Sequence, residues 1–273
     1  MSSNQEQIEY WNERAGETWA ELQDRLDELL APLSAAGLAA ANVRSGERVL
    51  DVGCGCGDTS IALNAMGANV LGIDVSGPML ARARSRDASI EYHQADAATT
   101  DFDHEFDLVF SRFGVMFFDD PRAAFKNLCS ALKPGGRLLF VCWQPPAVNP
   151  WMATAGRAIA PCLPPLDEAP DPRAPGPFAF AETHYIEQIL QDAGFSNIQI
   201  KSHGASLKVA DTLAEAVQFQ SRVGPAARVM SELEGDQRER ALAAVEEALR
   251  PFDAGSGLYL DSAVWLVSAR AQR

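Results

Sequence analysis

The sequence contains no run of about 18 consecutive apolar residues, the length that a helix needs to cross a bilayer. Basic residues are also few: 23 lysines and arginines stand against 37 aspartates and glutamates, and the formal net charge is -14. A field of that sign repels the phosphates of nucleic acids and the headgroups of anionic lipids. We therefore expect a protein that partners neither nucleic acid nor a membrane.

Cysteine is scarce as well. The five cysteines are Cys54, Cys56, Cys129, Cys142 and Cys162. Their odd number and irregular spacing do not suit a disulfide framework, and Cys54 and Cys56 are too close for a zinc knuckle. No metal site is therefore expected. Residues 1–7 are polar and lack the apolar stretch of a signal peptide, so we expect reduced thiols in the cytoplasm.

Hydrophobic periodicity changes along the chain. Residues 5–42 place apolar side chains at helical spacing, and Pro32 is expected to divide this stretch into two helices. Beyond it, short apolar strands alternate with helices. The expected strands are 48–53, 69–75, 90–94, 106–110 and 137–143, and the expected helices are 58–66, 77–86 and 122–132. Such alternation indicates crossover connections and a parallel sheet buried on both faces.

Proline is concentrated in one segment: ten of the 16 prolines fall between Pro145 and Pro177. Proline at that density excludes a regular helix or a central strand, so 145–180 is expected to be an irregular insertion over the ligand site. Trp151 within it is a candidate substrate-binding residue. The elements expected beyond it are helix 182–193, strand 197–209, helices 211–223 and 231–249, and strand 262–268.

The strand at 48–53 runs into a glycine-rich turn, Gly53-x-Gly55-x-Gly57, and Asp51 stands two residues before the first glycine. Glycine lets a ligand approach the backbone closely, and the helix that follows offers unpaired N–H groups. The turn does not have the G-x-G-x-x-G spacing of a dinucleotide site. A carboxylate here repels a pyrophosphate but attracts an amino group. S-adenosylmethionine, which carries an amino group and a sulfonium but no phosphate, suits that environment.

The turn from Asp51 to Gly57 resembles the first motif of class I S-adenosylmethionine-dependent methyltransferases, D/E-x-G-x-G-x-G, at every position. It is similar in particular to the small-molecule group that includes the quinone-biosynthesis C-methyltransferases. The resemblance is good over 45–144 and is one of pattern only over 180–200 and 258–271. It implies an α/β, Rossmann-like, doubly wound fold, with a mostly parallel seven-stranded sheet, helices on both faces and an antiparallel last strand.

The resemblance also implies roles for the residues of the turn and for the organisation of the chain. Gly53, Gly55 and Gly57 would shape the loop under the cofactor, and Asp51 would help to hold the methionine amino end. The implied parts are an N-terminal helical lid (1–44), a cofactor-binding core (45–144), the insertion over the acceptor site (145–180), and the C-terminal part of the same domain with a helical insertion (181–273).

Further cofactor residues are implied at the ends of the next two strands. Asp74 would accept both ribose hydroxyls, with Val75 beside it in the site. Met79 would pack near the adenine, with simple core packing as the alternative. Asp96 would accept from the adenine amino group and Ala97 would donate its backbone N–H to the ring. The alternative for Asp96 is to cap the next turn.

The fourth strand ends at the mouth of the expected site, because ligands of parallel sheets bind outside the carboxyl ends of the strands. Ser111 is expected to contact the cofactor there. Arg112 is expected to pair with a carboxylate of cofactor or acceptor, the alternative being a surface pair with Asp119 or Asp120. Phe113 is expected to form a platform for the acceptor, the alternative being packing between helix and sheet.

Aromatic residues of the N-terminal stretch are expected in the lid. Tyr10, Trp11 and Trp19 either cover the cofactor or pack a helix on the domain. No catalytic residue is assigned, because the sulfonium already activates the methyl group and the protein has to position the acceptor and exclude water. A base is needed only for a protonated acceptor. His184 and His203 are the candidates, by position alone.

The expected function is methyl transfer from S-adenosylmethionine to a small molecule, apolar or aromatic, with S-adenosylhomocysteine as product. Two alternatives stay open. One is a non-catalytic protein that binds the cofactor. The other is a nicotinamide-dependent oxidoreductase, against which Asp51 and the missing dinucleotide spacing argue. Neither the methylated atom nor the oligomeric state follows from the sequence.

Overall fold

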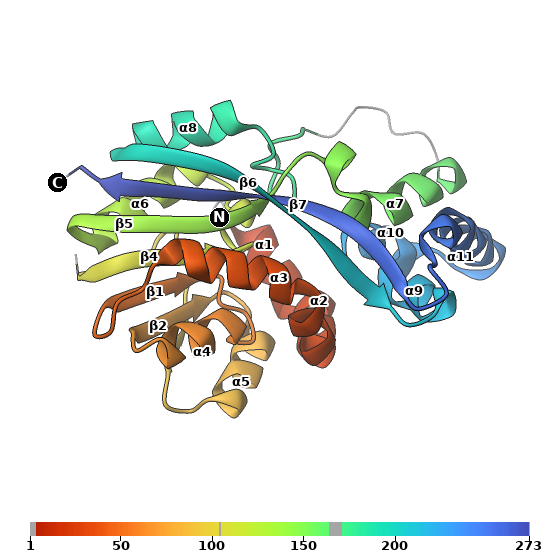
Figure 1. Cartoon of the computed structure of the whole chain (residues 1–273), viewed down its shortest axis with the longest axis horizontal. Helices are drawn as coiled ribbons and strands as arrows, with labels where there is room; N and C mark the ends of the chain where they lie inside the picture. Colours follow the sequence, from red (N-terminus) through yellow and green to blue (C-terminus); the bar gives the residue numbers. More distant parts are fainter. Residues whose placement is uncertain (1–3, 104, 164–170, 273) are drawn as a thin grey trace. The chain divides into compact units, whose positions relative to one another are not determined.

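The computed structural model describes residues 4–103, 105–163 and 171–272, which divide between two compact units (Figure 1). The first unit comprises Met1–Trp143, Arg173–His203 and Val264–Arg273, and the second comprises Gln144–Pro172 and Gly204–Ala263. The chain therefore leaves the first unit twice and returns to it twice. The roles expected for the four sequence segments, the lid and the insertion among them, stay predictions.

A seven-stranded sheet in the order β3-β2-β1-β4-β5-β7-β6 carries the fold. The strands are β1 (Arg48–Val52), β2 (Asn69–Asp74), β3 (Glu91–Gln94), β4 (Phe106–Arg112), β5 (Leu132–Trp143), β6 (Phe195–Ala210) and β7 (Leu258–Ala271). The first five strands pair in parallel, whereas β7 is antiparallel to β5. The predicted Rossmann-like class, mostly parallel with an antiparallel last strand, is confirmed.

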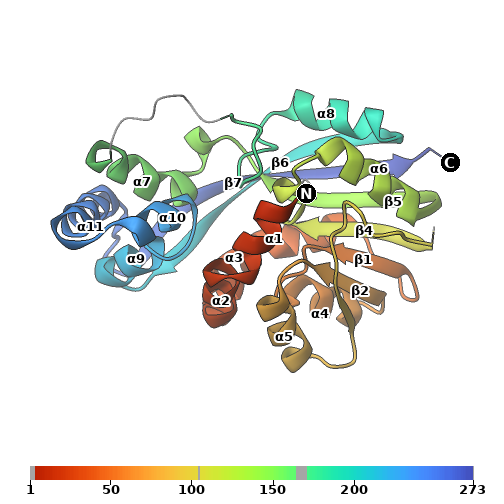
Figure 2. The same cartoon turned by 180° about the vertical axis from the view of Figure 1, so that it is seen from behind.

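Helices cover both faces of this sheet within the first unit (Figure 2). The helices α3 (Gln23–Ala41), α4 (Asp58–Ala65) and α5 (Gly77–Arg86) lie on one face, and α6 (Pro121–Ala131) and α8 (Thr183–Asp192) lie on the other. Leu139 of β5 joins the core cluster under α3–α5. The next residue, Phe140, points to the opposite face, where its ring lies 5.4 Å from that of Phe125. Among the helices of the described residues, none has the length and apolarity that a membrane span requires.

The N-terminal stretch forms α1 (Gln5–Asn12), α2 (Arg14–Glu21) and α3. The predicted break at Pro32 is wrong, because α3 continues through it. Pro32 and Glu28 are both exposed, so the Glu28 carbonyl that loses its N–H partner at the proline can bind water. The breaks fall instead at Glu13 and Leu22, which stand between the helices.

The second unit contains the helices α7 (Pro150–Ile159), α9 (Leu213–Gln220), α10 (Pro225–Glu232) and α11 (Gly235–Leu249). The expectation that proline excludes a regular helix from 145–180 is wrong for α7. Pro150 occupies its first position, where no N–H is needed, and the rest of α7 lacks proline. Trp151 is buried in this unit and stacks on Phe219, and its carbonyl accepts from Gln220 at 2.9 Å. Its expected contact with substrate stays a prediction.

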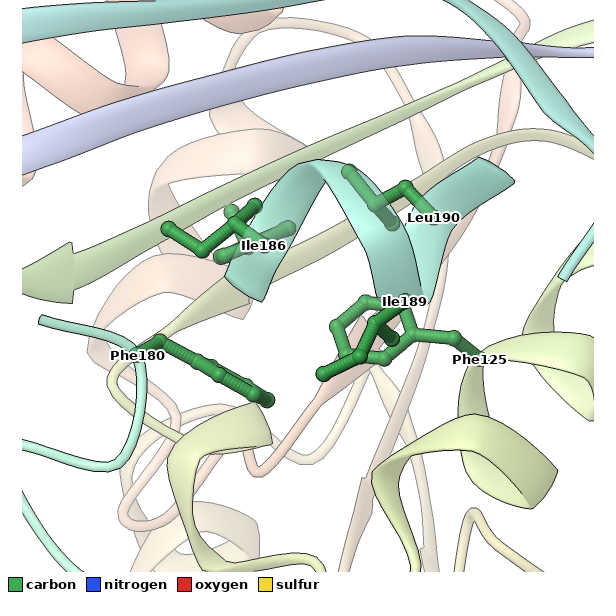
Figure 3. A pocket seen from close by; sticks show the side chains of 6 residues that line it. Phe125, Phe180, Ile186, Ile189 and Leu190 are labelled. Carbon is green, nitrogen blue, oxygen red and sulfur yellow. The ribbon is translucent and has the colours of Figure 1, made fainter. Parts of the chain in front are cut away.

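A narrow apolar gap, too tight for a water molecule, lies between α6, α8 and β5 (Figure 3). Its lining residues are Phe125, Phe140, Phe180, Ile186, Ile189 and Leu190. All six are at most 2% exposed, and none carries a polar side-chain atom. The gap is therefore part of the core that holds α8 on the sheet, and the functional site lies elsewhere.

Candidate functional site

The loop between β1 and α4 is built on three glycines in the left-handed backbone region. Gly53, Gly55 and Gly57 have φ values of +66°, +56° and +84°. A Cβ on Gly53 would lie 2.6 Å from the Cα of Gly114, and one on Gly55 would lie 2.7 Å from the Cε of Met79. Glycine is required here both by conformation and by close approach. The loop thus offers bare backbone at the carboxyl edge of the sheet.

Replacing Gly53 with alanine is expected to destabilise the protein by about 2–4 kcal/mol, since it adds backbone strain and a clash with the Gly114 backbone. Gly46→Ala is the matched control, because Gly46 also has a positive φ, +85°, but has open space around it. That variant should lose only about 1 kcal/mol. Urea unfolding measures both losses, and equal losses would contradict the close contact.

Asp51 is buried at the carboxyl end of β1, under the glycine loop. Its Oδ2 accepts from Thr59 Oγ1 at 2.7 Å and from Ser60 Oγ at 2.6 Å, both at the start of α4. Its Oδ1 is buried without a hydrogen-bond partner. Burial raises the pKa of this carboxyl from 3.8 to about 6, although the two hydroxyls and Arg112 oppose the shift. An orphaned buried acceptor with an unfavourable charge fits a cationic amino group.

Asp74 ends β2 and stands beside the glycine loop. Its Oδ2 accepts from the Gly55 N–H and its Oδ1 from the Ser76 N–H, each at 2.8 Å. Burial raises its pKa, and the backbone donors oppose that rise. Each oxygen uses one lone pair on these bonds and keeps another. The carboxylate is therefore held in one orientation and can still accept from the two hydroxyls of a ribose.

The remaining predicted cofactor residues lie around this pair. Val75 is partly buried in the turn after β2, and Met79 is buried with its methyl group against Gly55. Asp96 caps the turn after β3, accepting from the Ala98 N–H at 2.9 Å, as the alternative had it. Ala97 is buried in the same turn. The contacts of these residues with adenine stay predictions.

Ser111 and Arg112 end β4. Ser111 is buried and its Oγ donates to the Val52 carbonyl at 2.7 Å, which ties β4 to the start of the glycine loop. Arg112 pairs with Asp58 at 2.6 Å and also donates to Ser34 of α3. The alternative of a surface pair with Asp119 or Asp120 is therefore wrong. Asp58 follows the last glycine, so Arg112 fixes the N-terminus of α4.

Phe113 follows with a positive φ of +65°, a strained conformation for a bulky residue. Its ring stacks on that of Trp143, at the end of β5, with centroids 4.3 Å apart and planes 2° apart. Phe113 is partly exposed, whereas Trp143 is buried. Strain of this kind is often stored at ligand sites. The sequence pattern did not point to Trp143, which is the last residue of an apolar strand.

The N-terminal aromatic residues form one cluster around Trp11. Its ring lies 5.3 Å from that of Tyr10, 5.8 Å from Trp19 and 5.2 Å from Phe117, each edge to face. Phe117 belongs to the short helix η1 (Val115–Phe117) after β4. The cluster thus joins α1 and α2 to the carboxyl edge of the sheet.

The two histidine candidates do not contact the glycine loop through any described hydrogen bond. His184 is exposed on α8, with its Nε2 3.0 Å from Gln188 Nε2. His203 is partly buried on β6. Their role as bases stays a prediction. Unchanged turnover in both His184→Ala and His203→Ala would refute it.

The glycine loop after β1 and the carboxylates at the ends of β1 and β2 fall within one stretch of the chain that is similar to a known family. Residues 50–140 match the family model described as methyltransferase domain. The cofactor of this domain is S-adenosylmethionine, as expected from the sequence. The matched stretch runs from β1 into β5 and includes the glycine loop, Asp74 and Phe113.

Curated relatives align over the same region. A demethylmenaquinone methyltransferase from Clavibacter sepedonicus is 40% identical over 108 residues, which are 38% of this chain and 44% of the relative. An uncharacterized protein from Mycobacterium tuberculosis is 38% identical over 122 residues, 43% of this chain and 44% of its own length. The chain thus spans less than half the length of these relatives.

Solved structures resemble the whole fold. The YcgJ protein from Bacillus subtilis has a TM-score of 0.59 at 17% identity, over 89% of this chain and 99% of its own. Phosphoethanolamine N-methyltransferase 2 from Haemonchus contortus, solved with S-adenosyl-L-methionine, has a TM-score of 0.51 at 21% identity, over 89% of this chain and 53% of its own. At these identities the likeness establishes the fold.

Proposed function

We propose that this chain transfers a methyl group from S-adenosylmethionine to a small-molecule acceptor. The observation that carries the proposal is the orphaned Oδ1 of Asp51 at the end of β1, together with the oriented carboxylate of Asp74 at the end of the neighbouring strand β2. The first carboxylate suits the amino end of the cofactor and the second its ribose. When bound, S-adenosylmethionine supplies a methyl group that its sulfonium already activates.

In this proposal the residues of the chain bind and orient the cofactor and exclude water from the site. Asp51 holds the amino end and Asp74 holds the ribose, while Met79 and Ala97 contact the adenine. Arg112 holds Asp58 and thereby the start of α4, on which the Thr59 donor to Asp51 depends. The N-terminal helices form a lid that excludes water. Where the acceptor arrives protonated, His184 and His203 are the bases to test.

We also propose an apolar or aromatic acceptor, because the strained and partly exposed Phe113 ring at the end of β4 offers a flat apolar surface. Demethylmenaquinone and phosphoethanolamine, named for relatives of this chain, provide contrasting tests. With a net charge of -14, the protein disfavours the phosphate of the second. S-adenosylhomocysteine formation should therefore be seen with demethylmenaquinone and not with phosphoethanolamine, and the reverse result would refute the acceptor class.

Calorimetric titration with S-adenosylmethionine, S-adenosylhomocysteine and NADH tests the cofactor. We expect micromolar binding of the first two and none of NADH, because Asp51 repels a pyrophosphate. NADH binding alone would establish the nicotinamide alternative instead. Cofactor binding without methyl transfer to any acceptor pool would identify a non-catalytic binding protein. The predicted cytoplasmic location can be checked by fractionation of the producing cells.

A further inference from the structure

The end of α1 is hydrogen-bonded to the turn that follows β2. Asn12 Nδ2 donates to the Val75 carbonyl at 2.8 Å, and Asn12 Oδ1 accepts from the Gly77 N–H at 2.9 Å. Ser76 Oγ, between them, donates to the Trp11 carbonyl at 2.7 Å. Three hydrogen bonds thus join α1 to a turn that lies 63 residues away along the chain.

The same helix end reaches the opposite side of the glycine loop. The ring of Trp11 meets the ring of Phe117 edge to face, 5.2 Å apart, in the helix η1 that follows β4. Because the strand order is β2-β1-β4, the turn after β2 and the segment after β4 flank the carboxyl end of β1. The end of α1 therefore bridges the place where the glycine loop begins (Figure 2).

The bridge is closely packed against the turn. A Cβ on Gly16 of α2 would lie 2.6 Å from Ser76 Oγ and 2.1 Å from the Trp11 carbonyl oxygen. Gln94, at the end of β3, also donates to Asn12 Oδ1 at 3.1 Å and to the Val75 carbonyl at 3.0 Å. Asn12 is thus the centre of a polar network between α1 and two strand ends.

We infer that α1 is a strap across the cofactor site, that Asn12 is its latch, and that cofactor enters and leaves when this latch opens. The inference rests on the proposed function. The latched turn also carries the Ser76 N–H that orients Asp74, so the latch lies directly beside the ribose end of the site. Such a gate slows entry and exit together and leaves the equilibrium affinity nearly unchanged.

Stopped-flow tryptophan fluorescence with S-adenosylhomocysteine tests the latch, with Trp11 in the strap and Trp19 of α2, which packs on it, as reporters. Asn12→Ala removes two hydrogen bonds to the turn, each worth about 0.5–1.5 kcal/mol. We expect the association and dissociation rate constants both to rise by about tenfold, while Kd changes by less than about threefold. Gly16→Ala, which forces the strap away without removing a polar group, should act in the same direction.

Two further variants keep the outcome clear. Asn69→Ala is the matched control. Asn69 is the first residue of β2, remote from the strap, and its side chain donates to the Gly46 carbonyl. Gln94→Ala removes the two bonds of an exposed side chain and should accelerate both steps by a smaller factor, even where Asn12→Ala fails to fold.

Unchanged association and dissociation rate constants in these variants overturn the inference. A rise in dissociation and Kd without faster association makes Asn12 a positioning residue and overturns the latch. No binding by the wild type overturns the proposed function instead.

Discussion

Replacing Asp74 with alanine is expected to weaken S-adenosylmethionine binding about 100-fold. The variant loses two charge-assisted hydrogen bonds to the ribose, each worth about 1.5 kcal/mol or more, and it also frees the Gly55 and Ser76 N–H groups that the carboxylate holds. Calorimetry measures the loss directly, and a tenfold change corresponds to about 1.4 kcal/mol.

Asp87→Ala is the control of equal charge. Asp87 caps the end of α5 and is not buried, and its side chain bonds only to Ser89 in the described contacts, so replacing that side chain should leave binding unchanged. Asp74→Asn should fall between the wild type and Asp74→Ala. Its amide keeps one acceptor but turns an NH₂ group toward one of the two backbone donors. Equal Kd values for the wild type and Asp74→Ala would show that Asp74 does not bind the ribose.

Cofactor binding is expected to depend on pH through Asp51, whose pKa in the free protein is about 6. A cationic amino group beside Oδ1 lowers that pKa, so below pH 6 the carboxyl must release its proton when ligand binds. The Kd of S-adenosylhomocysteine should therefore be about tenfold weaker at pH 5 than at pH 7.5, with about one proton released per ligand at pH 5. Titration in buffers of different ionisation enthalpy counts that proton.

Asp51→Asn separates this effect from other titrating groups. The amide that replaces the carboxyl is neutral throughout, so the Kd of the variant should be weaker at pH 7.5 and flat between pH 5 and 7.5. Arg112 and Asp58, the charged side chains that act on Asp51, stay in place in the variant. If the Kd of Asp51→Asn still changed between pH 5 and 7.5, the proton released on binding would come from another group.

The Asp51 carboxyl also makes the stability of the free protein depend on pH, and here the dependence runs in the opposite direction to that of cofactor binding. Its pKa is raised on folding, so the native state binds the proton more tightly than the unfolded chain. Its contribution to stability is therefore present at low pH and is lost as the pH rises from about 4 to about 6. The stability of the wild type relative to Asp51→Asn should fall by about 2 kcal/mol between pH 4.5 and 7.5. Chemical unfolding of both proteins at the two pH values measures this difference.

Much of the fold followed from the sequence because local patterns determine it. The glycine spacing fixes a loop after the first strand, and the alternation of buried runs and helices fixes a parallel sheet. Pro32 misled because α3 accommodates a proline at a position where the freed Glu28 carbonyl is exposed, and exposure is not visible in the pattern. Pro150 misled for a related reason, since proline density does not show that a proline starts a helix.

The parts of the site that escaped prediction depend on contacts between distant segments. Arg112 pairs with Asp58 and Ser34, residues that meet only when α3 and α4 lie on the same face of the sheet. Asn12 and Val75 likewise meet only in the folded protein, because 63 residues separate them along the chain. One asparagine in a polar helix carries no local signal of that contact. Trp143 looked like the end of an apolar strand. Contact maps, which follow from folding as a whole, are needed to see such residues.

The position of β7 has a consequence for biosynthesis. β7 lies between β5 and β6, although it is made long after both, and it pairs residue 267 with residue 140. As the chain leaves the ribosome, β5 keeps an unpaired edge and β6 has no neighbour until 258–271 emerge. Unpaired edges of this kind are sites of aggregation, and pairings between distant residues form slowly. The sheet therefore cannot be completed during synthesis until β7 is inserted, and the exposed edge of β5 favours aggregation up to that point.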